Sequence, residues 1–89
     1  MDQNVTYQVY VLQNPLGRFY IGLSEDPAMR LIQHNTGVSR WTRNRGPWHS
    51  AWLSKPMTLT EARKLENLLK RQKGGRGFYE LTGLARSGS

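Results

Sequence analysis

The stretch Thr6–Ser24 reads TYQVYVLQNPLGRFYIGLS, and it decides the fold. Its two ends, Thr6–Gln13 and Arg18–Ser24, are rich in β-branched and aromatic residues, which favour extended strands. Between them, residues 14–17 (NPLG) have the composition of a tight turn, because proline presets φ and glycine tolerates positive φ. The stretch therefore predicts an antiparallel hairpin.

Two helices and a third strand are predicted to follow the hairpin. The first helix should begin after Asp26, whose side chain can cap free N–H groups, and end near Asn35–Gly37. Trp48–Ser54 (WHSAWLS) predicts a strand. Thr58–Glu61 has the spacing of a capping box, and the helix that it begins should run to Lys73. The order β-β-α-β-α indicates an α+β fold, a three-stranded antiparallel sheet flanked by helices.

The apolar positions predict how these helices pack. Leu31 and Ile32 share a face of the first helix, and we expect that face to lie on the sheet. Phe78–Leu84 should add a short helical turn that packs aromatic side chains on the core. We expect residues 1–89 to form a single domain, with a core over about residues 6–84 and a flexible tail at 85–89.

The charge gives the first indication of function. The 89 residues carry 13 Lys and Arg against 6 Asp and Glu, a net charge of +7 and a pI near 10.4. Such a field attracts polyanions, and phosphate contacts release counterions from nucleic acid. We therefore expect a nucleic-acid partner, in the first place DNA. An anionic membrane is a poorer expectation, since no stretch has the pattern of an amphipathic anchor or of a membrane span. The sequence leaves open a protein partner and the oligomeric state.

Cysteine usage and the N-terminus bear on location. The sequence contains no cysteine, which excludes a disulfide framework, Cys-ligated zinc and thiol catalysis. The first six residues form a short, polar segment that does not resemble a signal peptide. These features suit a reducing compartment, and we expect a cytoplasmic protein.

Some side chains are of the types that phosphodiester cleavage requires. Tyr or His can transfer protons, Arg can stabilise phosphate charge, and a carboxylate can hold a metal. Arg30 and His34 lie four residues apart and share a helix face, although spacing alone favours a solvated surface pair. Tyr10 and Tyr20 lie on the paired strands, where packing is the ordinary role of a tyrosine.

Glu66 is the candidate metal-binding carboxylate. It borders the apolar stripe of the second helix, where a carboxylate needs a partner. Lys70 at i+4 is one such partner and a metal ion is the other. Glu61 is better explained by the capping box.

Taken together, these separated features resemble the GIY-YIG nuclease superfamily over about residues 7–79. Gln8-Val9-Tyr10 stands at the first name motif, with Gln-Val in place of Gly-Ile, and Tyr20-Ile21-Gly22 matches the second motif fully. Arg30 follows Tyr20 by ten residues, the spacing of the superfamily's catalytic arginine. Glu61–Arg71 resembles its metal-binding helix, and residues 41–43 (WTR) and 46–48 (GPW) resemble the small standalone bacterial branch and Slx-type endonucleases.

The resemblance implies a metal-dependent endonuclease that hydrolyses phosphodiester bonds and leaves 5′-phosphate and 3′-hydroxyl ends. Tyr10, together with His34, is implied to activate or position water, and Tyr20 to line the site. Arg30 is implied to bind the scissile phosphate, and Glu66 to hold one Mg²⁺ or Mn²⁺. Two alternatives stay open: a nucleic-acid-binding module with little hydrolysis, and a subunit that acts only with a partner.

The sequence also departs from relatives with known roles. Leu23 stands where excinuclease C has a lysine, which argues against a role like that of excinuclease C in DNA repair. Without a zinc module or a DNA-reading domain in these 89 residues, specificity should be low or come from the structure of branched, damaged or single-stranded DNA. Gly22 should permit a close approach near the site. Phosphate contacts are expected from Arg40, Arg43, Arg45, Lys70 and Lys73.

Because the net charge is +7, we expect the protein to bind nucleic acid with micromolar or tighter affinity at low salt. The affinity should fall steeply as salt rises, since each phosphate contact releases counterions. A salt titration of binding to a labelled oligonucleotide measures both quantities. Absence of binding at low salt, or an affinity that stays flat across the titration, would argue against a nucleic-acid partner.

Overall fold

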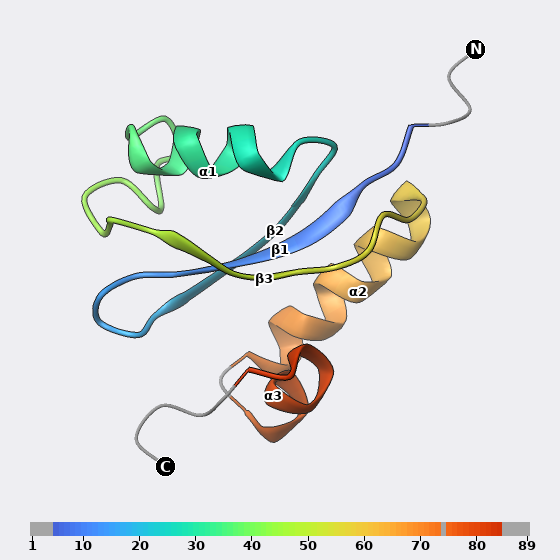
Figure 1. The fold of residues 1–89 in the computed structure, drawn as a ribbon. Coiled ribbons are helices and arrows are strands. Elements are labelled where there is room, and N and C mark those ends of the chain that lie inside the picture. The colour runs from blue at the N-terminus through green and yellow to red at the C-terminus, as the bar shows by residue number, and fades with distance from the viewer. Residues whose placement is uncertain (1–4, 74, 85–89) are drawn as a thin grey trace.

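The computed structural model describes residues 5–73 and 75–84. The sheet has the order β2-β1-β3, and β1 pairs antiparallel with both neighbours (Figure 1). No helix among the described residues is long and apolar enough to cross a membrane. In chain order the elements are β1 (Gln8–Gln13), β2 (Phe19–Ser24), α1 (Pro27–Asn35), β3 (His49–Leu53), α2 (Leu59–Gln72) and α3 (Arg76–Thr82).

The α+β fold and the element order predicted from the sequence are confirmed. The strands are one or two residues shorter at their ends than expected, and the turn predicted at Phe78–Leu84 is the helix α3. Both helix starts are also confirmed: Asp26 accepts a hydrogen bond from the Met29 N–H, and Thr58 and Glu61 form the capping box. The tail expected at residues 85–89 lies outside the described residues.

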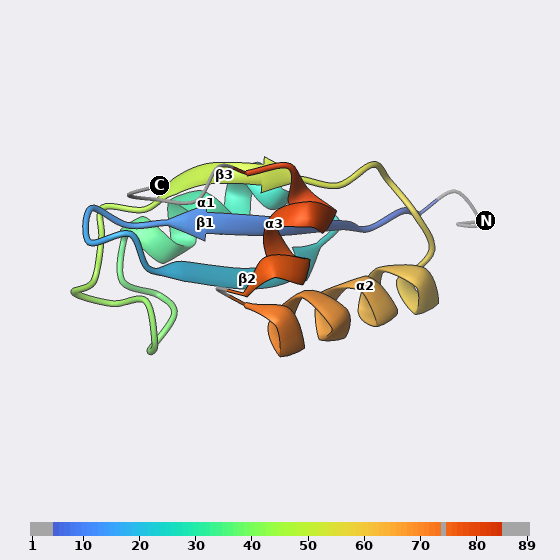
Figure 2. The ribbon, with the colours of Figure 1, turned by 90° about the horizontal axis from the view of Figure 1, so that it is seen from below.

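The alternation of side chains along β1 separates the structure into two layers on either side of the sheet. Val9 and Val11 face α2 and α3, whereas Tyr10 and Leu12 belong to a second cluster on the side of α1. Figures 1 and 2 show α1 on one side of the sheet and α2 and α3 on the other. The larger cluster holds Val9, Val11, Phe19, Ile21, Ala62, Leu69 and Phe78.

Helix α1 packs on the sheet through Leu31, as predicted, but with His34 in place of Ile32. His34 is 1% exposed, whereas Ile32 is 56% exposed. The expected packing of Ile32 on the sheet is therefore wrong, and so is the expected solvation of His34. The physical reason lies beneath the helix, where the buried Tyr10 hydroxyl requires a hydrogen-bond partner that an isoleucine cannot supply.

The long loop between α1 and β3 is fixed to the fold at its far end. The Asn35 side chain donates to the Trp48 carbonyl at 2.9 Å and accepts from the Trp48 N–H at 2.7 Å. The Trp48 indole N–H in turn donates to the Thr42 carbonyl at 3.1 Å. These bonds draw the middle of the loop back against α1, which brings Trp41 to Tyr20 and Thr42 to His34.

The packing of α2 predicts a large difference between two leucines of the same helix. Leu69 is fully buried, whereas Leu59 is 41% exposed. We expect Leu69→Ala to lower the free energy of unfolding by about 2–5 kcal/mol, because it leaves a cavity in the core. Leu59→Ala is the matched control, and its effect should stay within about 0.5 kcal/mol. Urea unfolding followed by circular dichroism measures both, and equal effects would contradict the assignment of the core.

Candidate active site

The centre of the candidate site is Tyr10, which lies directly opposite Gly22 in the pairing of β1 with β2. A Cβ atom on Gly22 would lie 2.5 Å from the Tyr10 hydroxyl oxygen, so the tyrosine side chain occupies the space that any other residue would fill. Tyr20 lies beside this pair, with its ring centroid 6.4 Å from that of Tyr10 and 4.6 Å from that of His34. The second-motif glycine therefore determines where the first-motif tyrosine can lie.

His34 connects Tyr10 to the loop through its two ring nitrogens. The Tyr10 hydroxyl lies 3.0 Å from Nε2, and the Thr42 hydroxyl lies 2.8 Å from Nδ1. Thr42 donates its own hydrogen to the Ser39 carbonyl at 3.4 Å, which leaves its oxygen to accept from Nδ1–H. We assign the tautomer accordingly: Nδ1 carries the hydrogen, and the Nε2 lone pair accepts from the Tyr10 hydroxyl.

Burial sets the protonation state of this pair. It lowers the pKa of His34 from 6.5 to about 4, and the nearby Arg30 charge acts in the same direction. His34 is therefore neutral near pH 7. Burial also raises the pKa of Tyr10, while the Arg30 guanidinium opposes that rise through a hydrogen bond and its charge. Tyr10 is thus a protonated phenol beside a neutral imidazole and a fixed positive charge.

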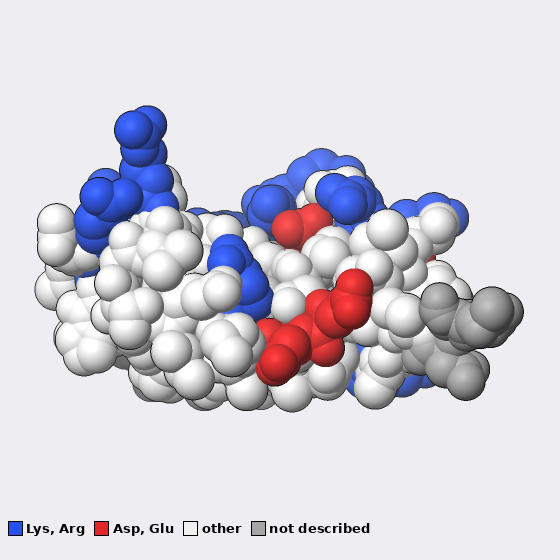
Figure 3. Space-filling view, turned by 90° about the horizontal axis from the view of Figure 1, so that it is seen from above, with Lys and Arg blue, Asp and Glu red and all other residues white. Residues whose placement is uncertain are grey.

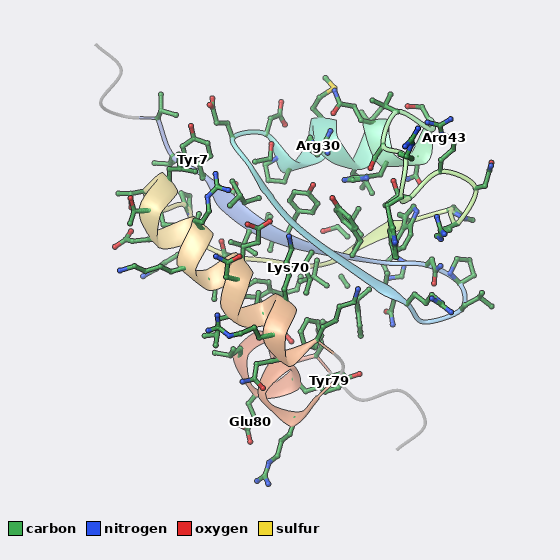
Figure 4. All side chains as sticks on the ribbon, turned by 180° about the vertical axis from the view of Figure 1, so that it is seen from behind. Tyr7, Arg30, Arg43, Lys70, Tyr79 and Glu80 are labelled. Carbon is green, nitrogen blue, oxygen red and sulfur yellow. The ribbon has the colours of Figure 1, made fainter. Side chains whose placement is uncertain are left out.

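Arg30 and Lys70 flank strand β2 from opposite sides. Arg30 extends from α1 and Lys70 from α2 (Figure 4). Arg30 is half-buried and its guanidinium donates to the Gln33 side chain at 2.5 Å, which holds it near Tyr10. A phosphate at this edge of the sheet would meet positive charge from two elements at once.

Glu66 faces the same edge from α2. Its side chain is only 12% exposed and forms an ion pair with Lys70 at 3.2 Å, so the predicted i+4 partner is present. Its charge also contributes to the raised pKa of Tyr10, which shows that the carboxylate is close to the tyrosine. The structure therefore brings Glu66 together with Tyr10, Tyr20, Arg30 and His34, as a functional site requires.

The residues around Glu66 fit one kind of metal ion. Within the described residues, no three His, Cys, Asp or Glu side chains form a cluster that could bind a metal. Zinc sites require three or four protein ligands, which does not match. Magnesium keeps several waters and binds through one or two carboxylates, and Glu66 can provide one such carboxylate. The site is therefore suited to Mg²⁺ or Mn²⁺ with water as most of its ligands.

The basic residues predicted to contact phosphate fall into two groups, one in the loop before β3 and one at the end of α2. Figure 3, seen from the side of α1, shows Lys and Arg side chains gathered in separate groups along one edge of the molecule. Trp41 links the groups, since the Arg45 guanidinium lies 4.9 Å and the Lys73 ammonium 5.4 Å from its ring centroid. The loop group is Arg40, Arg43 and Arg45, and the helix group is Lys70 and Lys73.

The comparison with protein families agrees with this arrangement. Residues 6–78 match the family described as the GIY-YIG catalytic domain. The chain belongs to the GIY-YIG family. Nuclease activity on nucleic acid is the general property of this family, and its members generally depend on divalent metal ions. No solved structure gives a significant match.

The curated relatives of this GIY-YIG protein are bacterial. It is 38% identical over 65 residues to a UPF0213 protein of Aeromonas hydrophila, a match that covers 72% of this chain and 48% of the relative. A UPF0213 protein of Aeromonas salmonicida is 36% identical over 67 residues, covering 74% of this chain and 49% of the relative. The chain thus spans about half the length of the curated relatives it matches.

Sequence reasoning missed the residues that support the site from the loop. Thr42 is buried and holds His34, and Gln33 holds Arg30. The segment around Trp41 and Thr42 carried a family resemblance, but no spacing rule connects a loop threonine with a helix histidine eight residues earlier. Asn35 lies at the end of α1, where the helix cap is Thr36, and its side chain binds the backbone of Trp48.

The lowered pKa of His34 predicts how stability depends on pH. The unfolded chain protonates this histidine as pH falls through 6.5, whereas the folded protein keeps it neutral down to about pH 4. The free energy of unfolding should therefore fall as pH decreases from about 6.5 to about 4, by about 1.4 kcal/mol for each unit of pKa difference.

Urea unfolding at a series of pH values measures this slope. His34→Gln should remove the part of the pH dependence of the unfolding free energy that this histidine causes. His49→Gln, at an exposed position of β3, should leave the pH dependence unchanged. A wild-type slope in His34→Gln would contradict the assignment of a buried neutral imidazole.

Proposed function

We propose that this GIY-YIG domain is a metal-dependent endonuclease that hydrolyses phosphodiester bonds of DNA and leaves 5′-phosphate and 3′-hydroxyl ends. The observation that supports this most is the 3.0 Å contact of the Tyr10 hydroxyl with His34 Nε2, at a place where Arg30 and Glu66 also converge. A proton acceptor, a phosphate-binding cation and a metal-binding carboxylate are the groups that such hydrolysis needs.

In this proposal the Tyr10–His34 pair handles the proton of the attacking water. Because the Tyr10 hydrogen points at Nε2, its oxygen keeps a lone pair that can accept from a water molecule beside the Arg30 guanidinium. As the water oxygen forms its bond to phosphorus, its proton passes to the Tyr10 oxygen and the phenolic proton passes to His34 Nε2. Thr42 keeps Nδ1 protonated, so the imidazole can accept only on the side that faces Tyr10.

Arg30 and Lys70 have separate tasks. Arg30 binds the non-bridging oxygens of the scissile phosphate, and its bond to Gln33 fixes it before the substrate arrives. Lys70 is 51% exposed and pairs with Glu66. A cation on Glu66 would replace this ion pair, and the Lys70 ammonium could then contact a neighbouring phosphate.

Glu66 holds the metal ion in this proposal. A bound Mg²⁺ or Mn²⁺ supplies Lewis-acid stabilisation of the charge on the phosphate and on the departing 3′ oxygen. Lys70 competes for the same carboxylate at 3.2 Å, so occupancy by the metal should depend on its concentration.

The experiment compares the cleavage of labelled duplex, flap, branched and single-stranded DNA across a Mg²⁺ titration, with EDTA as the zero point. We expect Glu66→Gln to lose cleavage by a factor of about 10² or more while retaining DNA binding, because Lys and Arg provide most of the affinity. Glu61→Gln is the matched control, since glutamine can also serve in the capping box that Glu61 forms.

The outcomes separate the proposal from its alternatives. Cleavage by wild type and Glu61→Gln but not by Glu66→Gln supports a metal-dependent nuclease. Normal cleavage by Glu66→Gln, together with loss of cleavage in Glu61→Gln, would show that Glu66 is not the metal ligand. DNA binding without cleavage of any substrate favours a nucleic-acid-binding module or a subunit that acts only with a partner. In the binding module, the family's nuclease residues would form a binding surface.

A further inference from the structure

Trp41 is a partly exposed aromatic side chain at the edge of the site. Its ring is 40% exposed, although it lies 5.7 Å from the ring of Tyr20 and 5.9 Å from that of Trp48. Burying the rest of the indole would be favourable, so a tryptophan left open beside a candidate site needs an explanation. The aromatic neighbours fix the position of the ring and leave part of it available to a ligand.

The space next to Trp41 is a cleft that leads away from the site. A hollow of about 320 Å³ is bounded by Tyr20, Trp41 and the two lysines at the end of α2. A second hollow of about 280 Å³ continues toward the hairpin turn, where Arg18 lies, and Trp41 and Lys73 line both hollows. The two neighbouring hollows share Trp41 and Lys73, so aromatic and cationic side chains line the surface path from Tyr20 to Arg18.

The positive charges along this path are only partly balanced, since Lys70 pairs with Glu66 and Lys73 lies beside further cations. Burial lowers the pKa of Lys73, and the positive charges of Arg18 and Lys70 lower it further. Within residues 5–73 and 75–84, no carboxylate forms an ion pair with Lys73. An anion beside Lys73 would offset its repulsion by Arg18 and Lys70. The cleft is thus suited to a ligand that carries both an aromatic face and phosphate.

We propose that Trp41 stacks on an unpaired base of the DNA strand whose phosphate enters the site, and that Lys70 and Lys73 bind the backbone of that strand. A paired base inside a duplex has both faces covered by its neighbours, whereas an unpaired base offers one to an aromatic side chain. The base takes the place that the Lys73 ammonium holds over the indole, and the ammonium moves to the phosphate. The inference rests on the proposed function for the position of the strand, and it names the substrate class: DNA with unpaired nucleotides next to the cut.

The test measures binding rather than cleavage. Fluorescence anisotropy gives the affinity of the protein for a labelled single-stranded oligothymidylate and for a duplex of equal length, in EDTA and at one ionic strength. We expect wild type to prefer the single strand. Trp41→Leu, which keeps apolar bulk and loses the π face, should bind the single strand roughly tenfold or more weakly and the duplex nearly as before.

Two further variants show whether the effect belongs to stacking. Trp41→Phe retains an aromatic ring and should keep most of the preference for single-stranded over duplex DNA. If Trp41→Leu weakened binding through a folding defect, an aromatic ring would not be what restores the preference. Leu59→Ala, at an apolar position with 41% exposure on the far end of α2, should bind as wild type does. Thermal unfolding of each variant confirms that the fold is present.

The inference fails if Trp41→Leu binds the single strand as tightly as wild type, or if it weakens single strand and duplex equally. Its failure differs from that of the proposed function, because the binding assay contains no metal. A wild-type protein that cleaves DNA but shows no dependence on Trp41 overturns the stacking site alone. A protein that cleaves nothing but needs Trp41 for single strands overturns the nuclease alone.

Discussion

The hydrogen bond between the Tyr10 hydroxyl and His34 Nε2 is the interaction on which the site depends. Both groups are almost fully buried, so each polar atom must find a partner inside the protein. This requirement explains why α1 turns a histidine rather than an isoleucine toward the sheet. It also explains Gly22, since the tyrosine side chain reaches the histidine only across a residue without a Cβ.

Side chains of the loop between α1 and β3 hold this hydrogen bond in place. Thr42 binds the other nitrogen of His34, and the Thr42 carbonyl is itself held by the Trp48 indole. Trp48 is fixed by Asn35, one residue after the histidine. The end of α1 and the loop that follows thus close on each other around the imidazole. A buried polar network that is fully satisfied is rigid, and rigidity is what a group that must position water requires.

The part of the structure that could be predicted from the sequence is the part that depends on local rules. The hairpin, the capped starts of α1 and α2 and the element order follow from turn composition, capping spacing and periodicity. The face of α1 was predicted only in part: Leu31 packs on the sheet, but periodicity ranks Ile32 above His34 and takes no account of the hydroxyl of a distant tyrosine. From the residues alone, Arg30 and His34 fitted a solvated surface; the family resemblance identified them as site residues.

The supporting residues depend on geometry that no local rule contains. Thr42 meets His34, and Trp41 meets Lys73, only because the loop is folded back by the contacts of Trp48. Glu66 pairs with Lys70, as the i+4 spacing predicted, and its carboxylate also lies close to Tyr10, which no local rule could predict.

The Tyr10 hydroxyl is the atom at which the proposed chemistry can be tested most directly. Tyr10→Phe removes that one oxygen and keeps the ring that packs against Leu12 and Trp48. The measurement is the single-turnover cleavage rate of a labelled DNA substrate with Mg²⁺, together with binding in EDTA and the thermal unfolding temperature. The account predicts a folded variant that binds DNA normally and cleaves about 10²-fold or more slowly. Cleavage at the wild-type rate would contradict it.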